Sequence, residues 1–267
     1  TGFLEPDYGE ISINGINLKS NPLRAKEYIG YLPEGAPSYS DMIVSDFLSF
    51  IGKMRGLRKK TLSNRLDEMA NQINLKEMWN RPIETLSKGF KRRVGIAQAL
   101  IHDPDILILD EPTDGLDPNQ KHEMRNLIKR ISTNKAIVIS THILEEVEAV
   151  CSRAVIIANG KLLANDTPKN LENKFLNKNT LSIKVSNKIN NVISKDIKSL
   201  IKYDDVKIQK TDMSTHTILV SDNKKVPNLN TVLKQINKLK LDVIEANFQK
   251  VSLEEIFRTI TSENNSK

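Results

Sequence analysis

The segment at residues 106–111 constrains the fold of this chain more than any other. Four consecutive apolar residues, Ile-Leu-Ile-Leu, are followed directly by Asp110 and Glu111. Such a run indicates a strand buried on both faces, which is typical of a parallel sheet covered by helices. The strand would place two carboxylates at the C-terminal edge of the sheet, where open α/β sheets bind ligands. Since such acids can hold Mg²⁺ between phosphates and orient an attacking water, the pattern predicts a magnesium–nucleotide site.

Composition limits the class of protein. The 267 residues are 39% hydrophobic and 27% charged, which is ordinary for a soluble globular protein with one sizeable core and a smaller domain. No apolar run approaches the roughly 20 residues of a membrane-spanning helix, so any membrane role would come through a partner. The only cysteine, Cys151, cannot form an intrachain disulfide, and no secretory signal is recognisable. We therefore expect a cytoplasmic protein.

Charge and the first residue add two expectations. The net charge is +7, but the lysines are scattered and no basic run alternates with aromatic residues, so nucleic acid is not expected as a partner. Residue 1 is Thr rather than Met, which indicates a processed chain or a piece of something longer.

Strands, polar loops and helices alternate in the first part of the chain. Ser45 and Asn21 are predicted to cap their helices, and Met54 to share an apolar helix face with Phe47. Asn-Gly pairs at 14–15 and 159–160 predict two hairpins. Strands are expected at 29–32, 106–110 and 136–139, and helices at 22–28, 45–54, 62–73, 89–101, 118–131, 143–150 and from Pro168.

The composition changes at residues 177–180, a polar stretch rich in Asn and Lys that we interpret as a linker. Beyond it the predicted order is βαββαβ, that of a small α+β ferredoxin-like domain, followed by a helix with capping-box spacing at Ser252 and Glu255. Strands are expected at 181–185, 206–209, 217–220 and 243–248, and helices at 192–202 and 229–239.

Five motifs in order carry a resemblance to a known family. They are Leu-Ser-Lys-Gly-Phe at 86–90, the acid-tipped strand at 106–110, Glu111, Gly-Leu-Asp-Pro at 115–118 and His142. Each alone is a weak signal, but their order and spacing together resemble the ATP-binding subunit of an ABC transporter over residues 1 to about 170. In that family they are the signature motif, Walker B, the catalytic glutamate, the D-loop and the switch histidine.

The resemblance implies roles for the acids and the histidine. Asp110 would hold Mg²⁺, Glu111 would act as the general base or orient the attacking water, and His142 would contact the γ-phosphate of ATP. The ordinary alternatives are two exposed acids at a strand end and a surface histidine at a helix start. Asp117, three residues before Gln120, suits a helix N-cap as well as a place at the dimer seam.

The resemblance also implies a surface for a second subunit. Ser87, Lys88 and Gly89 would contact ATP held by that subunit, because a helix N-terminus with free N–H groups binds anions. Ser87 could equally be a simple helix cap. Lys88 and Phe90 depart from the commonest pattern, which has Gly and Gln there, while Gly89 keeps the close backbone approach.

Glu34 occupies the place where the family usually has the Q-loop glutamine. The run Tyr-Leu-Pro-Glu at 31–34 resembles the branch that serves ABC-2 type exporters, including the gliding-motility type. The Ser-Lys-Gly signature and the added C-terminal domain point to the same branch, which implies export. A solvated loop glutamate is the alternative for Glu34.

One family element does not occur within the 267 residues. The resemblance implies a phosphate loop, G-x-x-x-x-G-K-[ST], and residues 1–6 look like the segment that follows the helix after it. We therefore expect an N-terminally truncated chain that lacks Walker A and the central strand of the sheet. Without that backbone cradle and its lysine, the chain should bind ATP poorly by itself.

These observations lead to one expected architecture and function. Residues 1–176 form an ABC-type P-loop NTPase domain, a mostly parallel sheet with an antiparallel edge and a helical subdomain at about 40–90, and residues 181–267 form the accessory domain. The protein would bind and hydrolyse ATP with Mg²⁺, as one of two ATP-binding subunits in a homo- or heterodimer below a separate membrane permease. Alternatives are a non-catalytic half-site lending its signature face to a partner, or a soluble ABC ATPase acting on nucleic acid or ribosomes. The latter is disfavoured because no coiled-coil arm or second cassette is present.

Overall fold

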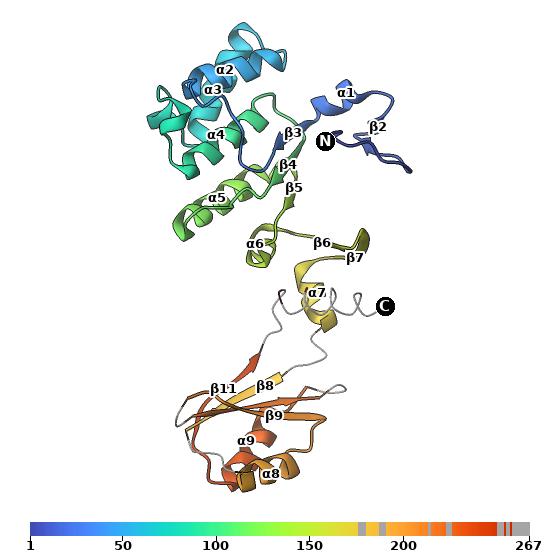
Figure 1. The fold of residues 1–267 in the computed structure, drawn as a ribbon, viewed down its shortest axis with the longest axis vertical. Coiled ribbons are helices and arrows are strands. Elements are labelled where there is room, and N and C mark those ends of the chain that lie inside the picture. Colours follow the sequence, from blue (N-terminus) through green and yellow to red (C-terminus); the bar gives the residue numbers. More distant parts are fainter. Residues whose placement is uncertain are drawn as a thin grey trace. The chain divides into compact units, whose positions relative to one another are not determined.

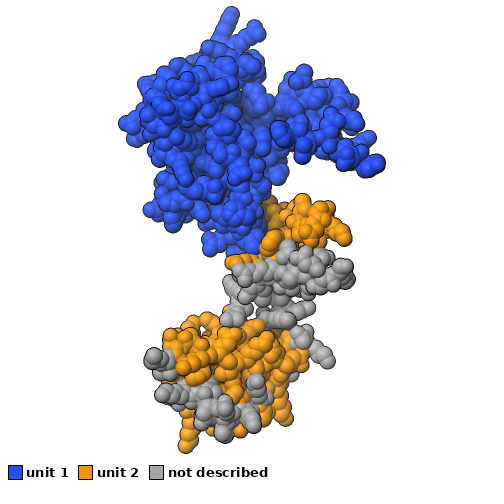
Figure 2. Space-filling view, in the orientation of Figure 1, with its two compact units in different colours: residues 1–150 blue, residues 151–267 orange. Residues whose placement is uncertain are grey.

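The computed structural model describes residues 1–175, 180–186, 191–212, 215–222 and 226–249, together with Glu254 and Phe257. The chain divides into two compact units, Thr1–Val150 and Cys151–Lys267, which Figure 2 colours separately. The linker predicted at 177–180 lies largely outside the described residues, and Thr180 already belongs to a strand. The predicted domain boundary stays a prediction.

A three-stranded parallel sheet organises the first unit. Its order is β3 (Ile29–Leu32), β4 (Ile106–Asp110) and β5 (Ala136–Ser140), with both pairs parallel. The predicted strand with acids at its end is therefore confirmed as the middle strand, but burial on both faces was wrong, since Ile106 and Ile108 are only half-buried. Leu107 and Leu109 are fully buried. This burial fixes the strand in the core. The polar groups at its C-terminal end therefore also have a defined position.

Helices pack around this sheet, and those labelled α2, α3 and α4 lie together in Figure 1. The apolar stripes predicted for α4 and α5 are confirmed, and both helices contribute to the core that includes β4. The helices of the unit are α1 (Pro22–Glu27), α2 (Val44–Met54), α3 (Lys59–Gln72), α4 (Lys88–Leu100), α5 (Pro118–Ile131) and α6 (Leu144–Val150). Short 3₁₀ turns at Lys76–Met78 and Ile83–Thr85 connect α3 to α4.

Two local predictions, for Ser45 and Met54, were wrong, and that for Asn21 was right only in position. Helix α2 begins one residue before Ser45, because the backbone N–H of Ser45 donates to the carbonyl of Trp79 at 3.0 Å and needs no capping side chain. Asn21 occupies the N-cap position of α1 but makes no side-chain capping bond. Met54, the last residue of α2, is 72% exposed rather than on a buried face like Phe47.

The first hairpin is confirmed at the N-terminal end of this unit. Strands β1 (Ser12–Ile13) and β2 (Ile16–Asn17) pair antiparallel. The turn between them needs two left-handed residues, and Asn14 and Gly15 supply them with φ values of 48° and 76°.

Among its described residues the second unit contains a hairpin, three helices and a four-stranded antiparallel sheet. The sheet order is β11-β8-β10-β9, and every neighbouring pair is antiparallel. Along the chain, β8, α8, β9, β10, α9 and β11 follow one another, which confirms the predicted order βαββαβ. The elements are β6 (Ala154–Ala158), β7 (Lys161–Asp166), α7 (Pro168–Phe175), β8 (Thr180–Val185), α8 (Asn191–Leu200), β9 (Asp205–Lys210), β10 (His216–Ser221), α9 (Leu229–Lys238) and β11 (Val243–Gln249).

This antiparallel sheet has its own core with α8 and α9. Leu181, Ile183 and Val185 of β8 are fully buried, and they belong to one apolar cluster with Ile197 of α8 and Val232 of α9. The alternation along β8 explains this, because every second side chain points to the same face. The capping box predicted at Ser252 and Glu255 lies outside the described residues.

Within the part of the chain that the structure describes, no helix combines the length and the apolar character that crossing a membrane requires.

Gly30 of β3 provides a test of how closely α4 packs on the sheet. A Cβ added there would lie 2.2 Å from the carbonyl oxygen of Ala99 and 2.9 Å from Cδ1 of Leu107. We expect Gly30→Ala to lower the free energy of unfolding by about 1–3 kcal/mol, measured by chemical denaturation. Gly89→Ala is the control, because its added methyl would meet only the end of the Gln120 side chain. Equal stability of the two variants would contradict this packing.

Candidate functional site

The C-terminal ends of β4 and β5 bring the predicted acids and histidine together. In the parallel register Asp110 lies opposite Ser140, whose hydroxyl donates a hydrogen bond to Oδ1 of Asp110. One residue further, the backbone N–H of Glu111 donates to the carbonyl of Ser140 at 3.0 Å. Both strand ends are thus tied by a side-chain and a backbone hydrogen bond. This arrangement places Glu111 next to the loop that carries His142.

Glu111 and His142 form a direct pair. The imidazole Nδ1 and the backbone N–H of His142 lie 2.8 and 3.2 Å from Oε1 of Glu111. Glu111 has a left-handed backbone, with φ of 45°, which is uncommon for a residue with a side chain and recurs at functional sites. Its other oxygen, Oε2, is buried and has no hydrogen-bond partner among the described residues. That oxygen keeps an unfilled acceptor site, but it is shielded from solvent in this structure.

The pairing sets the electrostatics of His142. The hydrogen bond and the charge of Glu111 raise the pKa of the His142 imidazole above its usual value, and the charges of Asp114 and Glu146 act in the same direction. Since Nδ1 faces a carboxylate oxygen, it carries the proton. The raised pKa favours the imidazolium form, in which Nε2 also carries a proton and can donate to an anion.

Asp110 fits a magnesium site of the kind completed by phosphates. Oδ1 is occupied by the Ser140 hydroxyl, and no group of three or more potential ligands from His, Cys, Asp and Glu gathers anywhere among the described residues. Mg²⁺ commonly binds through only one or two carboxylates, with waters and substrate phosphates completing an octahedron. One Asp at a strand end therefore suits Mg²⁺ bound together with a nucleotide.

The signature and D-loop residues form a second group. Ser87 caps α4, because its Oγ accepts the backbone N–H of Phe90 at 3.4 Å, and Asp117 caps α5, because its Oδ1 accepts that of Gln120 at 2.9 Å. Both predicted caps are confirmed. Gly89 is buried against the Gln120 side chain, and a methyl added at Gly115 would lie 3.5 Å from Nζ of Lys88. The two motifs therefore lie side by side.

Glu34 follows β3 at the C-terminal edge of the sheet, where Leu32 pairs with Leu109, but in the described part of the chain it bonds to neither group. It is exposed in the turn after β3. Among the described residues it has no hydrogen bond or ion pair, and no such bond joins Ser87 to Glu111 either. The sequence also did not single out Ser140. The sequence did predict two strands, neighbouring along the chain, that end at Asp110 and just before Ser140. The parallel register of β4 and β5 then places Ser140 opposite Asp110.

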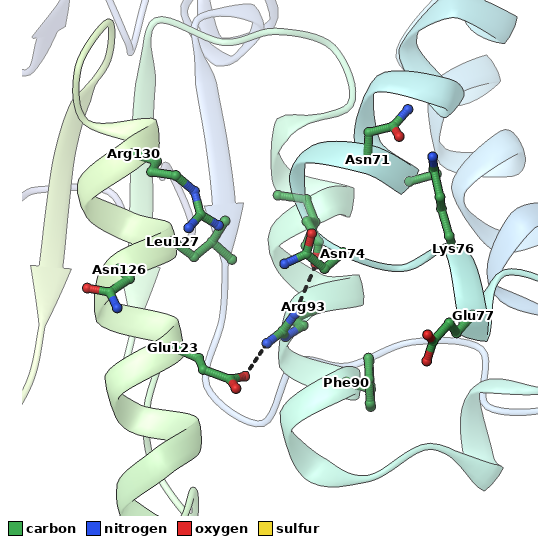
Figure 3. Close-up of a pocket in the computed structure, with 12 residues that line it drawn as sticks. Asn71, Asn74, Lys76, Glu77, Phe90, Arg93, Glu123, Asn126, Leu127 and Arg130 are labelled. Carbon is green, nitrogen blue, oxygen red and sulfur yellow. Dashed lines mark hydrogen bonds and ion pairs between the residues drawn. The ribbon is translucent and has the colours of Figure 1, made fainter.

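A cleft of about 660 Å³ lies between α3, α4 and α5, and it contains none of the predicted site residues (Figure 3). Arg93 of α4 crosses it. The guanidinium pairs with Glu123 of α5, donates to the carbonyl of Ile73 at 3.4 Å, and lies 5.5 Å from the ring centroid of Phe90. Arg93 therefore fastens the signature helix to the end of α3 and to α5.

Comparison with known proteins gives the family. A family model described as ABC transporter matches residues 1–114. The linearmycin resistance ATP-binding protein LnrL of Bacillus subtilis is 31% identical over 263 residues, which cover 97% of this chain and 84% of that protein. The chain belongs to the ABC transporter ATP-binding family.

Two further similarities agree with this membership. This chain is 33% identical over 171 residues to the Nod factor export ATP-binding protein I of Ralstonia nicotianae. The match covers 64% of this chain and 53% of that protein. It therefore spans about half the length of that relative. A solved structure described as an ATP-binding subunit of an ABC transporter aligns with a TM-score of 0.57 at 30% identity, covering 65% of this chain and 73% of that one.

The pair between Glu111 and His142 predicts a measurable pKa change. Glu111→Gln removes the charge that raises the pKa of His142, so that pKa should fall toward 6.5 in a histidine-selective NMR titration. Because the folded-state pKa is raised, the pair stabilises the fold below pH 6.5, and this stabilisation is lost as pH rises through the folded-state pKa.

The matched control for this titration is Glu145→Gln. It removes one charge from the start of α6 at a side chain that is 85% exposed and 3.9 Å from Arg125. We expect it to leave the His142 titration unchanged. If Glu111→Gln and Glu145→Gln gave the same His142 titration curve, Glu111 would not be the group that sets the pKa of the imidazole.

Proposed function

We propose that this protein hydrolyses ATP with Mg²⁺ and couples the reaction to export through a separate membrane subunit. The observation that carries the proposal is the state of the Glu111 carboxylate. One oxygen is held by His142, while the other is buried without a partner among the described residues. A carboxylate fixed in this way can accept a proton from water at a defined position.

The proposed roles are those that the family resemblance implies, and the position of each group is compatible with its role. Glu111 orients and deprotonates the attacking water with its carboxylate. The imidazolium form of His142, favoured by its raised pKa, donates from Nε2 toward the γ-phosphate. Asp110 would hold Mg²⁺, which neutralises charge on the phosphates when bound. Because the backbone N–H groups at the start of α4 can bind an anion, Ser87, Lys88 and Gly89 would contact ATP held by a second subunit.

The proposed assembly is a pair of ATP-binding subunits at the inner face of the cell membrane, bound to a permease. Asp117 would lie at the seam of the pair and Glu34 in the Q-loop. Export is supported by the relatives named for linearmycin resistance and for Nod factor export, and by the Tyr-Leu-Pro-Glu run of the ABC-2 type branch at 31–34. We also propose that residues 1–176 form the ATP-binding domain and 181–267 a ferredoxin-like accessory domain.

Glu111→Gln tests the proposed chemistry. The amide cannot take a proton from water, so turnover should fall by about 10²–10⁴-fold while ATP binding is kept. The variant and the wild-type protein should be expressed from the complete reading frame together with the membrane partner. Phosphate release reports turnover, and equilibrium binding of ATP reports affinity.

Glu145→Gln serves again as the charge-matched control and should retain wild-type turnover. Steady hydrolysis by Glu111→Gln would remove Glu111 from its role. Absence of ATP binding by the wild-type protein with its partner would instead favour the non-catalytic half-site.

A further inference from the structure

Glu146 is a buried acid that the proposed chemistry does not use. It lies in α6 and is only 2% exposed. Its two oxygens accept from different hydroxyls: Thr113 Oγ1 donates to Oε1, and Thr141 Oγ1 donates to Oε2 at 3.1 Å. Burying a carboxylate is costly unless it is hydrogen-bonded, so these two contacts account for its place in the fold.

The two threonines belong to the two loops that form the site. Thr113 lies two residues after Glu111 and is itself only 2% exposed. Thr141 directly precedes His142, and its hydroxyl also accepts the backbone N–H of Ile143 at 3.1 Å. One side chain of α6 therefore bonds to the segment after the proposed base and to the segment that carries its partner histidine.

The pair between Glu111 and His142 needs such support. The side chain of His142 is 69% exposed, and ion pairs open to solvent contribute little to holding a geometry. The backbone bond from Glu111 to Ser140 fixes the strand ends, but it lies before the loop that turns at Thr113. Glu146 adds a link between the two loops beyond the strands, besides the contact of Glu111 with His142 itself.

We propose that Glu146 is a positioning residue, which aligns Glu111 with His142 by holding Thr113 and Thr141 at a fixed separation. This inference rests on the proposed roles of Glu111 and His142 in ATP hydrolysis. Glu146 itself contacts no reacting atom in this scheme, and it acts through the two threonine hydroxyls.

Thr113→Val is the main test, because valine has the shape of threonine and leaves every charge in place. We expect kcat for ATP hydrolysis to fall about 10- to 100-fold with KM for ATP nearly unchanged, since small misplacements of reacting groups have effects of this size. The pKa of His142 should move toward 6.5, because its ring is no longer held against Glu111. Thr113→Ser keeps the hydroxyl and should restore both readouts.

The control is Thr133→Val, which removes a hydroxyl that donates to the carbonyl of Arg130 at 3.1 Å, away from these loops. It should change neither readout. Glu146→Asp is a second test variant, because it keeps the charge but is too short to reach both hydroxyls. It should reproduce the loss seen in Thr113→Val, and it covers the case in which that variant does not fold.

Two readouts separate the possible failures. If wild-type protein with its partner does not hydrolyse ATP, the proposed function is wrong, but the titration of His142 still tests the positioning. If Thr113→Val and Glu146→Asp fold and keep both kcat and the wild-type His142 titration, Glu146 is not a positioning residue. Lower stability without a change in either readout would mean that the network only stabilises the fold.

Discussion

The parallel pairing of β4 with β5 is the constraint on which the site depends. Its register places Asp110 opposite Ser140, and both strands end there. A shift of one residue would turn the side chains of one strand to the other face, so Asp110 would lose its hydroxyl partner and Glu111 its neighbour. The full burial of Leu107 and Leu109 opposes such a shift, because the face that would then turn to the core ends in the carboxylate of Asp110. The core thus favours this register, and the register brings the segments that carry Glu111 and His142 to neighbouring strand ends.

The same packing also holds the signature helix. Helix α4 approaches β3 so closely that only a glycine fits at position 30, and Gly89 at its other end lies against Gln120 of α5. Arg93 adds bonds to α5 and to the end of α3. Ser87 and Gly89 therefore do not lie on an independent loop. Their position follows from helices that share one core with the strand carrying Asp110.

The sequence predicted well what depends on neighbours along the chain. Apolar period, caps at Ser87 and Asp117, and Asn-Gly turns are local signals, and the elements that they predict are present. The cap predicted at Ser45 was wrong because the first N–H groups of α2 bond to carbonyls more than thirty positions away. No local pattern can reveal such bonds. Glu146 also bonds to a distant residue, Thr113. The sequence shows Glu146 only as one acid in a helical segment, so it could not predict the positioning role.

The two glutamates of this region illustrate why burial alone does not identify a reactive acid. Glu146 is the more buried, but both of its oxygens accept hydrogen bonds from threonines. Glu111 has one oxygen held by His142 and one buried oxygen without a partner among the described residues. The bonds of Glu146 suit it to holding loops together, whereas a buried acceptor without a partner, like that of Glu111, is a feature that a catalytic role can explain. The distribution of hydrogen bonds, more than the depth of burial, therefore separates the proposed base from the residue that positions it.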